Sequence, residues 1–324
     1  MKLNRKKINE IEKPSIRMLL QAADKIGVDV ELVDKNNLIY RLEKNGKIEY
    51  IKSKNTLLPF NTTVSNKISA NKQLSKKLLA LAGIKTPAGH LLESKEELKK
   101  YLDNGKLTYP LVIKPNALMC GLGVFANLGK WEDAELACRN IERSPEIKNK
   151  SFIAEEFFRA RDFRVLTLDD NVLATMERVI PKIVGNGQDT IEKLISDFRK
   201  GEDRLVMDDE ITRNIDNAGY KKTDILDAGQ ELVLRYNANV ATGGIGMNVT
   251  DQVSEYFKEI AVKSLAALGL RYGGVDIMTN DISDSDADYR VIEVNGSPDM
   301  AMHNFPHKGS PLDVAPVIIE KLFS

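Results

Sequence analysis

Two stretches near the C-terminus decide the fold: GGVDIMTN at residues 273–280 and YRVIEVNG at residues 289–296. Each is a short apolar run with a few polar residues set into it, which is typical of a buried β-strand. Asp276 lies in the first run, and Glu293 and Asn295 lie in the second. Side chains two positions apart on a strand point to one face, so Glu293 and Asn295 project together. Asp276 joins them if the two strands pair.

These three side chains predict a site for a hard metal ion. Two carboxylates and an amide oxygen on one face form a ligand set that suits Mg²⁺. The alternative is a polar sheet face turned toward water, which is less favourable because apolar residues bracket the charged ones. The chain has only two cysteines, Cys120 and Cys138, and three scattered histidines. That count excludes a disulfide framework, a thiolate zinc site and a typical His-rich metal centre.

The rest of the chain predicts mixed helices and strands, without repeats or low-complexity segments. Asn45-Gly46 between two alternating runs predicts a hairpin with a type I′ turn. Residues 62–83 carry apolar residues at helical spacing and predict one amphipathic helix. After residue 151, three consecutive strands are expected, FIAEEFF, FRVLTL and NVLATMERVI. This order favours an α+β protein over a regular βαβ series.

Length and charge set wider limits on the function. The 324 residues suggest about two domains. Lys and Arg together number 47, as do Asp and Glu, so the formal net charge is +0. This balance argues against a protein whose main function is to bind nucleic acid. No run approaches the roughly 18 apolar residues of a membrane span, and the N-terminal residues lack the apolar core of a secretory signal. We therefore expect a cytoplasmic protein with no membrane and no nucleic-acid partner.

Lys114 ends an apolar run at residues 111–113 and precedes a loop that contains Gly121 and Gly123. A lysine at a strand end can aim its ammonium group at phosphate, while N–H groups of a glycine loop approach the anion closely. The alternative is a solvated lysine beside a surface turn. A single Gly-x-Gly is a weak signal, and this loop is neither a Walker A loop nor a dinucleotide fingerprint. Cys120 is expected to fill space rather than act as a nucleophile, because no base lies near it in the sequence.

Two further polar stretches suit ligand recognition, but each has an ordinary alternative. Glu155 and Glu156 precede the charged stretch RDFR at residues 161–164. A carboxylate at a strand end can bind ribose hydroxyls, yet on sequence alone a charge-paired hairpin explains this stretch better. The amides of NANVATGG at residues 237–244 suit a polar substrate, and they equally suit a turn.

Taken in order, these motifs resemble those of ATP-grasp ligases over nearly the whole chain. The family's opening segment is similar to residues 71–87, with Asn71 in place of the usual Asp. VIKP, IAEEF with RDFRVL, VDIM and IEVNGSP resemble the lysine, nucleotide-hinge and magnesium strands. Within the family, the chain is most similar to two groups: the glutathione synthetase module of bifunctional glutamate–cysteine ligase/glutathione synthetases, and the ATP-grasp domain of cyanophycin synthetases. MERV, LRYNANVATGG and Met302-His303 carry that likeness.

The resemblance implies an α+β ATP-grasp fold whose two lobes clamp ATP. It divides the chain into a short α/β lead-in at 1–60 (a truncated N-terminal substrate domain), an N-lobe at 61–150, and a C-lobe at 151–324 with the metal and substrate site. It implies an ATP- and Mg²⁺-dependent ligase that joins a carboxylate to an amine through an acyl phosphate. The substrates would be γ-glutamylcysteine and glycine, or those of a cyanophycin-like reaction. A non-catalytic ATP-binding module is a less favoured alternative, and C-terminal motifs disfavour a kinase or carboxylase.

The resemblance also implies a role for each site residue. The catalytic residues would be Arg178, Arg235 and Lys114. The ATP-binding residues would be Lys72, Lys114, Gly121, Gly123, Glu155, Glu156, Phe157 and Asp162. Two Mg²⁺ ions, or Mn²⁺, would be held by Asp276, Glu293 and Asn295. The substrate would contact Arg164, Asn237, Asn239, Thr242, Gly243, Gly244 and His303.

Two departures from the family's pattern affect this expectation. Gly274 stands where many dipeptide ligases carry an arginine, but the most similar groups also have a small residue there, so no loss of activity follows. The lead-in is shorter than the N-terminal substrate domain of classical ATP-grasp peptide ligases. We therefore expect a homodimer mate or a partner subunit to complete the site for the small-molecule amino acid or peptide substrates.

Overall fold

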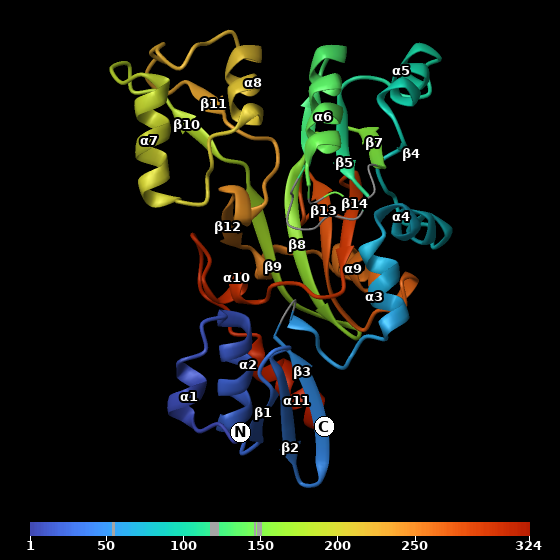
Figure 1. The fold of residues 1–324 in the computed structure, drawn as a ribbon, viewed down its shortest axis with the longest axis vertical. Helices are drawn as coiled ribbons and strands as arrows, with labels where there is room; N and C mark the ends of the chain where they lie inside the picture. Colours follow the sequence, from blue (N-terminus) through green and yellow to red (C-terminus); the bar gives the residue numbers. More distant parts are fainter. Residues whose placement is uncertain (54–55, 117–122, 146, 148–150) are drawn as a thin grey trace.

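The computed structural model describes residues 1–53, 56–116, 123–145, 147 and 151–324. At its centre is an antiparallel sheet in the order β12-β9-β8-β13-β14 (Figure 1). Its strands are β8 (Arg161–Leu168), β9 (Asn171–Val179), β12 (Ile245–Asn248), β13 (Tyr272–Thr279) and β14 (Tyr289–Asn295). Helix α9 (Glu255–Ala267) packs on this sheet, and Phe257 joins Phe163 and Val275 in one buried core. The alternating apolar residues of the strands supply that core.

The register of the central sheet confirms the predicted pairing of the two C-terminal strands. Strands β13 and β14 are antiparallel, with Asp276 opposite Glu293 and Gly274 opposite Asn295. On its other edge β13 pairs with β8, which puts Asp276 opposite Arg164. Directly opposite residues of antiparallel strands present their side chains on the same face. The register alone therefore gathers acidic and basic groups on one face of this sheet.

A second sheet, in the order β4-β7-β5-β6, faces the central one. Its strands are β4 (Gly89–Leu92), β5 (Leu111–Pro115), β6 (Phe125–Leu128) and β7 (Phe152–Glu156). Helices α5 (Lys95–Asp103) and α6 (Trp131–Arg143) pack against it over a core that includes Leu98, Ile113 and Cys138. Of the three consecutive strands expected after residue 151, β7 belongs to this sheet, whereas β8 and β9 belong to the central sheet. The chain thus crosses between the sheets at residues 157–160.

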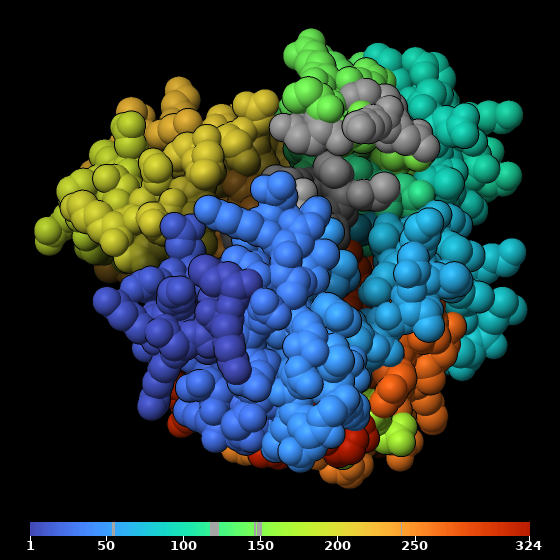
Figure 2. Space-filling view, turned by 60° about the horizontal axis from the view of Figure 1, so that its bottom comes forward, coloured from blue at the N-terminus to red at the C-terminus, as the bar shows by residue number. Residues whose placement is uncertain are grey.

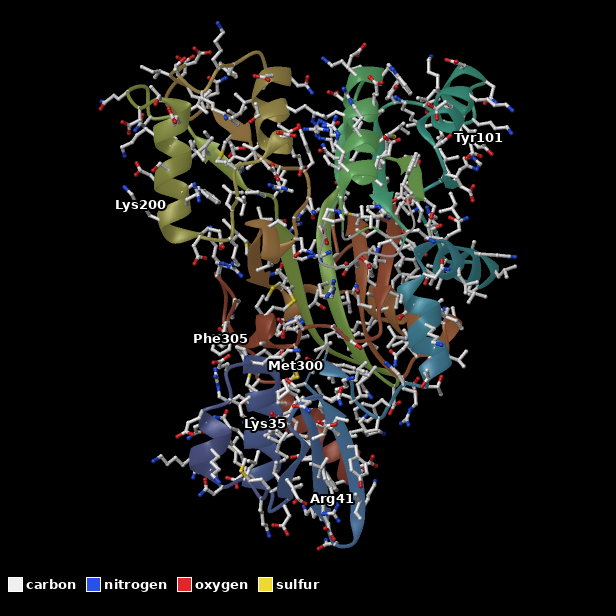
Figure 3. All side chains as sticks on the ribbon, in the orientation of Figure 1. Lys35, Arg41, Tyr101, Lys200, Met300 and Phe305 are labelled. Atoms are coloured by element: carbon white, nitrogen blue, oxygen red, sulfur yellow. The ribbon has the colours of Figure 1, made fainter. Side chains whose placement is uncertain are left out.

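The N-terminal residues form a three-stranded sheet, β1 (Asp29–Asp34), β2 (Ile39–Lys44) and β3 (Lys47–Lys52), with helices α1 (Arg5–Asn9) and α2 (Pro14–Lys25). The predicted hairpin is confirmed, because Asn45 and Gly46 both have positive φ, at 53° and 81°. The C-terminal helix α11 (Ala315–Phe323) packs against α2, so the two ends of the chain share one core (Figure 1). Met300, labelled in Figure 3, also belongs to this core, with Leu166 of the central sheet.

A further unit lies between β9 and β12 in the sequence. It contains β10 (Lys182–Val184), α7 (Ile191–Gly201), α8 (Asp209–Asn217) and β11 (Glu231–Val233), with its own apolar core. Short 3₁₀ turns follow at η2 (Val240–Thr242) and η3 (Thr250–Gln252), and a short helix at α10 (Ala301–Asn304). Figure 2 shows this unit in yellow on one side of the N-terminal unit, with the lobe of α5 and α6 on the other side. Within the described residues, none of the helices combines the length and apolar character needed to cross a membrane.

The single helix predicted over residues 62–83 is wrong, because the structure has two helices there. These are α3 (Thr63–Ala70) and α4 (Lys72–Leu81). Asn71 separates them with an extended backbone, at φ −102° and ψ 100°, and its side-chain oxygen accepts a hydrogen bond of 3.1 Å from the N–H of Leu74. An Asn side chain competes for backbone donors and so favours a helix start over a helix interior. The break places Lys72 at the first position of α4.

We expect Asn71→Ala to lower the free energy of unfolding by about 1 kcal/mol, the usual loss when an N-cap is removed. Asn71→Asp keeps the acceptor oxygen and is the matched control, expected to be close to the native protein. Urea unfolding followed by circular dichroism measures both variants. An alanine variant as stable as the aspartate variant would contradict the capping role of Asn71.

Candidate active site

A cavity of about 420 Å³ lies between the central sheet and the four-stranded sheet. Its size is that of a site for a small molecule or nucleotide. Part of the wall is apolar and comes from both sheets, the crossing segment and the residues after β11: Val112, Ala126, Phe157, Ile180, Tyr236, Met278 and Ile292. The charged part of the wall is formed by Lys72, Lys114, Glu155, Glu156, Arg161, Asp162, Glu177, Arg178, Asp276 and Glu293. Flat apolar surface beside dense charge suits a ligand with an aromatic ring and an anionic group.

A buried carboxylate between two lysines forms the basic end of the cavity. Glu155 on β7 is 2% exposed, its Oε1 lies 2.5 Å from Nζ of Lys114, and its Oε2 contacts Nζ of Lys76 on α4. Burial by itself raises the pKa of Glu155, but Lys114 and Lys76 lower it more, and the net direction is down. Burial lowers the pKa of Lys76 despite its contact with Glu155. Two ammonium groups on one carboxylate leave net positive charge, which favours an anion at this end.

The opposite side of the cavity holds an arginine–carboxylate network. Nη2 of Arg178 lies 2.6 Å from Oδ1 of Asp162 and 3.0 Å from Oδ2 of Asp276. Arg164 binds the same Asp276 carboxylate with two N–H groups, one of them at 2.9 Å. A Cβ at Gly274 would lie 2.7 Å from Cδ of Arg164, so the glycine leaves room for this arginine. Arg164 from the neighbouring strand thus passes close to the backbone of Gly274.

The pKa values of the two buried carboxylates of this network are shifted in opposite directions. Burial raises the pKa of Asp162, and Arg178 compensates only in part. Burial also acts to raise the pKa of Asp276, but Arg164 and Arg178 lower it more. Burial acts to lower the pKa of Arg178, but Asp162 and Asp276 raise it more, and the net direction is up. Asp276 and Arg178 are therefore charged partners at neutral pH.

The predicted metal ligands occupy neighbouring positions of β13 and β14, and their oxygen chemistry fits a hard cation. Asp276 and Glu293 line the cavity opposite each other, and Asn295 follows two positions further along β14. Two carboxylates and an amide oxygen match the preference of Mg²⁺. In the structure these carboxylates pair with basic groups, including Lys72, whose Nζ lies 3.1 Å from Glu293. No group of three or more His, Cys, Asp or Glu side chains suited to a metal occurs among the described residues.

Several residues expected at the site lie outside the part of the cavity wall that the described residues form: Arg164, Arg235, Asn295, Gly123, Thr242, Gly243, Gly244 and His303. Asn237 and Asn239 do line the cavity. The guanidinium of Arg235 is bound by Asp208 and Glu210, each at 2.7 Å. His303 is 2% exposed, and burial, with a contribution from Arg164, lowers its pKa to about 3, so the ring is neutral. Gly121 and Cys120 lie outside the described residues.

The site also contains residues that the sequence did not single out. Lys76 follows Lys72 by one helical turn, and spacing of four residues on a helix places both on one face, so periodicity could have found it. Arg161 and Glu177 form a two-point ion pair at the cavity, with distances of 2.8 and 2.6 Å. Tyr236 packs edge-to-face on Phe157, with ring centroids 5.7 Å apart. Arg161 begins the charged stretch RDFR noted in the sequence, but nothing local identified its partner Glu177 on the next strand or the contact of Tyr236 with Phe157.

We expect Glu155→Gln to lower the free energy of unfolding by about 3–5 kcal/mol at pH 7, because it leaves two buried ammonium groups without their counter-charge. The folded-state pKa of Glu155 is depressed, so its contribution is present above the pKa of the unfolded chain, about 4.3. The difference in the free energy of unfolding between the native protein and the variant should narrow as the pH falls from the unfolded-chain pKa toward the folded-state pKa. Urea unfolding at a series of pH values measures this difference, and a difference that widens below pH 4 would contradict the ion-pair role.

Comparison with known proteins places this arrangement in a family. The family model of the RimK-like ATP-grasp domain matches residues 69–186 and 218–322. A second model, of an ATP-grasp-like domain, matches residues 14–56. The first match covers both sheets that enclose the cavity and leaves out residues 187–217, which contain α7 and α8.

Individual relatives agree with the family match. The chain is 32% identical over 271 residues to a cyanophycin synthetase of Trichormus variabilis, covering 79% of this chain and 29% of that protein. It is 29% identical over 325 residues to the glutathione biosynthesis bifunctional protein GshAB of Streptococcus mutans, covering 95% and 42%. A crystal structure of a bifunctional glutathione synthetase from Pasteurella multocida matches with 27% identity and a TM-score of 0.64, covering 95% of this chain and 44% of the other.

The chain thus spans less than half the length of these relatives. The family match nevertheless covers more than half of the chain, and it contains the lysine strand β5, the crossing at residues 157–160 and the paired strands β13 and β14. The α+β fold with two lobes that the sequence predicted is confirmed. The chain belongs to the RimK-like ATP-grasp family.

Proposed function

We propose that this chain is an ATP- and Mg²⁺-dependent ligase that joins a carboxylate to an amine on an amino acid or short peptide, through an acyl phosphate. The observation that carries the proposal is the composition of the cavity between the two sheets. There, an apolar slot, the lysine end and the opposed carboxylates Asp276 and Glu293 meet in about 420 Å³. Each part suits one portion of the ATP molecule.

The apolar slot suits the adenine ring. Val112, Ile180 and Met278 come from facing strands and turns of the two sheets, and Phe157 with Tyr236 closes one end. A flat ring gains from burial between such side chains. The crossing segment offers backbone groups beside the slot. Glu156 and Asp162 line the cavity, where their carboxylates would accept hydrogen bonds from the ribose hydroxyls.

The charged wall suits the phosphates and the reacting groups. Lys72 and Lys114 supply ammonium groups for the phosphate oxygens, and Lys76 shares the charge of Glu155 with Lys114. Asp276, Glu293 and Asn295 would hold two Mg²⁺ ions, or Mn²⁺, whose charge neutralises phosphate oxygens during transfer. Arg178 supplies positive charge from the other side of the cavity, where the acyl phosphate would form.

The chemistry needs no covalent protein intermediate. A carboxylate oxygen attacks the γ-phosphorus, the bond to the β–γ bridging oxygen breaks, and ADP leaves. The amine nitrogen then attacks the activated carbonyl carbon, inorganic phosphate leaves, and the nitrogen loses a proton. Cys138 has no part in this, because it lies on the buried face of α6 and burial raises its pKa to about 12. Positioning and charge stabilisation are thus the work of the protein.

Two substrate pairs fit the proposed chemistry. The relative named GshAB suggests γ-glutamylcysteine with glycine, and the cyanophycin synthetases suggest addition of an amino acid to a peptide. Asn237 and Asn239 would face the amino-acid side of the cavity. We also propose that a homodimer mate or a partner subunit contributes to the substrate side of the site. A non-catalytic ATP-binding module is disfavoured, since the lysines and the opposed carboxylates are all retained at the cavity.

The direct test measures ADP and phosphate release from ATP and Mg²⁺ across a matrix of amino acids, γ-glutamylcysteine and short acidic peptides. We expect release to require one carboxylate–amine pair, with a stoichiometric coupled product detected by mass spectrometry. A folded protein that binds ATP but is stimulated by no pair would overturn the proposal in favour of a regulatory module.

We expect Glu293→Gln to reduce turnover by about 100-fold or more, because the variant removes a charge from the proposed Mg²⁺ ligands. The Mg²⁺ concentration needed for half-maximal rate should also rise. Glu259→Gln is the matched control, since Glu259 lies on the exposed face of α9 with its side chain 66% exposed. Steady-state rates over a Mg²⁺ series measure both effects. Retention of most activity at low Mg²⁺ would contradict the metal-ligand role.

We expect Arg178→Lys to lower kcat by about 10-fold or more while the affinity for ATP changes little. The guanidinium would act where negative charge develops in the transition state, rather than where the ground-state nucleotide binds. Steady-state kinetics together with calorimetric titration of a non-hydrolysable ATP analogue separate the two effects. A variant that loses ATP affinity as much as kcat would show that Arg178 binds the nucleotide instead.

A further inference from the structure

The segment outside the family match, residues 187–217, contacts both walls of the cavity. Its helices α7 and α8 pack with β10 and β11 over one small core, which includes Ile195, Ile211 and Leu232. In Figure 1, α8 stands beside α6, which belongs to the lobe of the four-stranded sheet. A unit with its own core can move as one body, so its contacts with the rest of the chain set its position relative to the two walls of the cavity.

On one side, α8 bonds to the lobe that carries Lys114. Nη2 of Arg213 donates a hydrogen bond of 3.1 Å to the carbonyl oxygen of Ala126, a residue of β6 that lines the cavity. One turn later, Nδ2 of Asn217 lies 3.3 Å from the carboxylate of Asp133 at the start of α6. Arg213 is 7% exposed, so its bond to Ala126 is buried between the lobes, whereas the contact of Asn217 with Asp133 is part-buried.

On the other side, α8 holds the segment that forms the opposite wall. Asp208 caps the helix, and Glu210 lies in its first turn. Together they bind the guanidinium of Arg235, each at 2.7 Å. Nδ2 of Asn214 donates to the carbonyl oxygen of Leu234 at 3.0 Å. The wall residues 236–239 follow directly, so one helix of nine residues links both walls.

The contact between the lobes carries an electrostatic cost. Among the described residues, Nε and Nη1 of Arg213 are buried without a hydrogen-bond partner. Unpaired buried polar atoms cost free energy, and separation of the lobes would expose those of Arg213 to water. Beside the opposite wall, Oε1 of Glu210 also has no partner, and burial raises the pKa of Glu210 to about 7, although Arg235 opposes that shift. Favourable contacts of a ligand in the cavity would offset the cost of holding the lobes together.

We propose that Arg213 is a positioning residue that holds the two walls of the cavity in register. On one side it donates to the carbonyl oxygen of Ala126, and on the other its Nη2 donates a hydrogen bond of 3.0 Å to Oδ1 of Asn214, whose Nδ2 donates to the carbonyl oxygen of Leu234. This inference rests on the proposed function for its kinetic consequence only. By fixing β6 relative to residues 236–239, Arg213 sets the distance between the nucleotide and the second substrate. Arg213 touches neither of them, and Arg235 acts here by placing the segment that follows it.

The test measures the separation of the lobes directly, without reference to turnover. Spin labels are attached at Arg139→Cys on α6 and Lys200→Cys on α7, in a Cys120→Ser background. Pulsed electron paramagnetic resonance then measures the distance between the two labels. Both labelled side chains are exposed, and Lys200 points away from the cavity (Figure 3). We expect a non-hydrolysable ATP analogue with Mg²⁺ to narrow the distance distribution in the native background. Arg213→Met should keep it broad, and Arg213→Lys should recover part of the narrowing.

The kinetic arm follows the same variants. We expect Arg213→Met to lower kcat by about 10-fold or more, with less than a threefold change in affinity for the ATP analogue, and Arg213→Lys to be intermediate. Lys200→Met is the matched control and should leave both unchanged. If Arg213→Met does not fold, the same distance measurement is made on Asn217→Ala, which removes the contact with Asp133 and should also keep the distribution broad. An unchanged distance distribution in the folded variant would overturn the inference, whereas a native protein without ligase activity would overturn only the proposed function.

Discussion

The structure depends on the burial of charge between β8, β9, β13 and β14. Asp162, Asp276, Arg164 and Arg178 lie on one face of the central sheet because their strands pair in a register that sets each acid opposite a base. A buried ion without a partner costs several kcal/mol, so this face is stable only when each carboxylate meets an arginine. The requirement fixes the register of the strands, and the register in turn places Asp276 beside Glu293 at the cavity.

The crossing between the two sheets explains why the cavity has two chemical characters. Strand β7 ends in one sheet and β8 begins in the other, so the residues between them border both lobes. Lys114 and Glu155 come from the four-stranded sheet, and Arg178 and the opposed carboxylates come from the central sheet. Lys72 and Lys76 come from α4, which packs against β14 and α9. The same ions that balance one another in the structure are those that an anionic nucleotide would engage. Stability and binding therefore draw on one set of charges.

The chain extends the family domain in two places. The C-terminal helix α11 packs against α2, so the N-terminal unit is tied to the last residues of the chain through one core. The segment with α7 and α8 lies outside the family match and rests on the opposite lobe through Arg213 and Asn217.

The sequence by itself determined the features that short-range rules control. The alternation around Asp276 and Glu293 predicted two strands with acids on one face, because the period of a strand is local. Asn45-Gly46 predicted the N-terminal hairpin of β2 and β3, because turn geometry is also local. Only the tertiary structure decided the sheet to which β7 belongs, the pairing of Lys76 with Glu155 and the partners of Arg235. These depend on which segments meet across the molecule, since the free energy of burying an ion is set by neighbours that are distant in the chain.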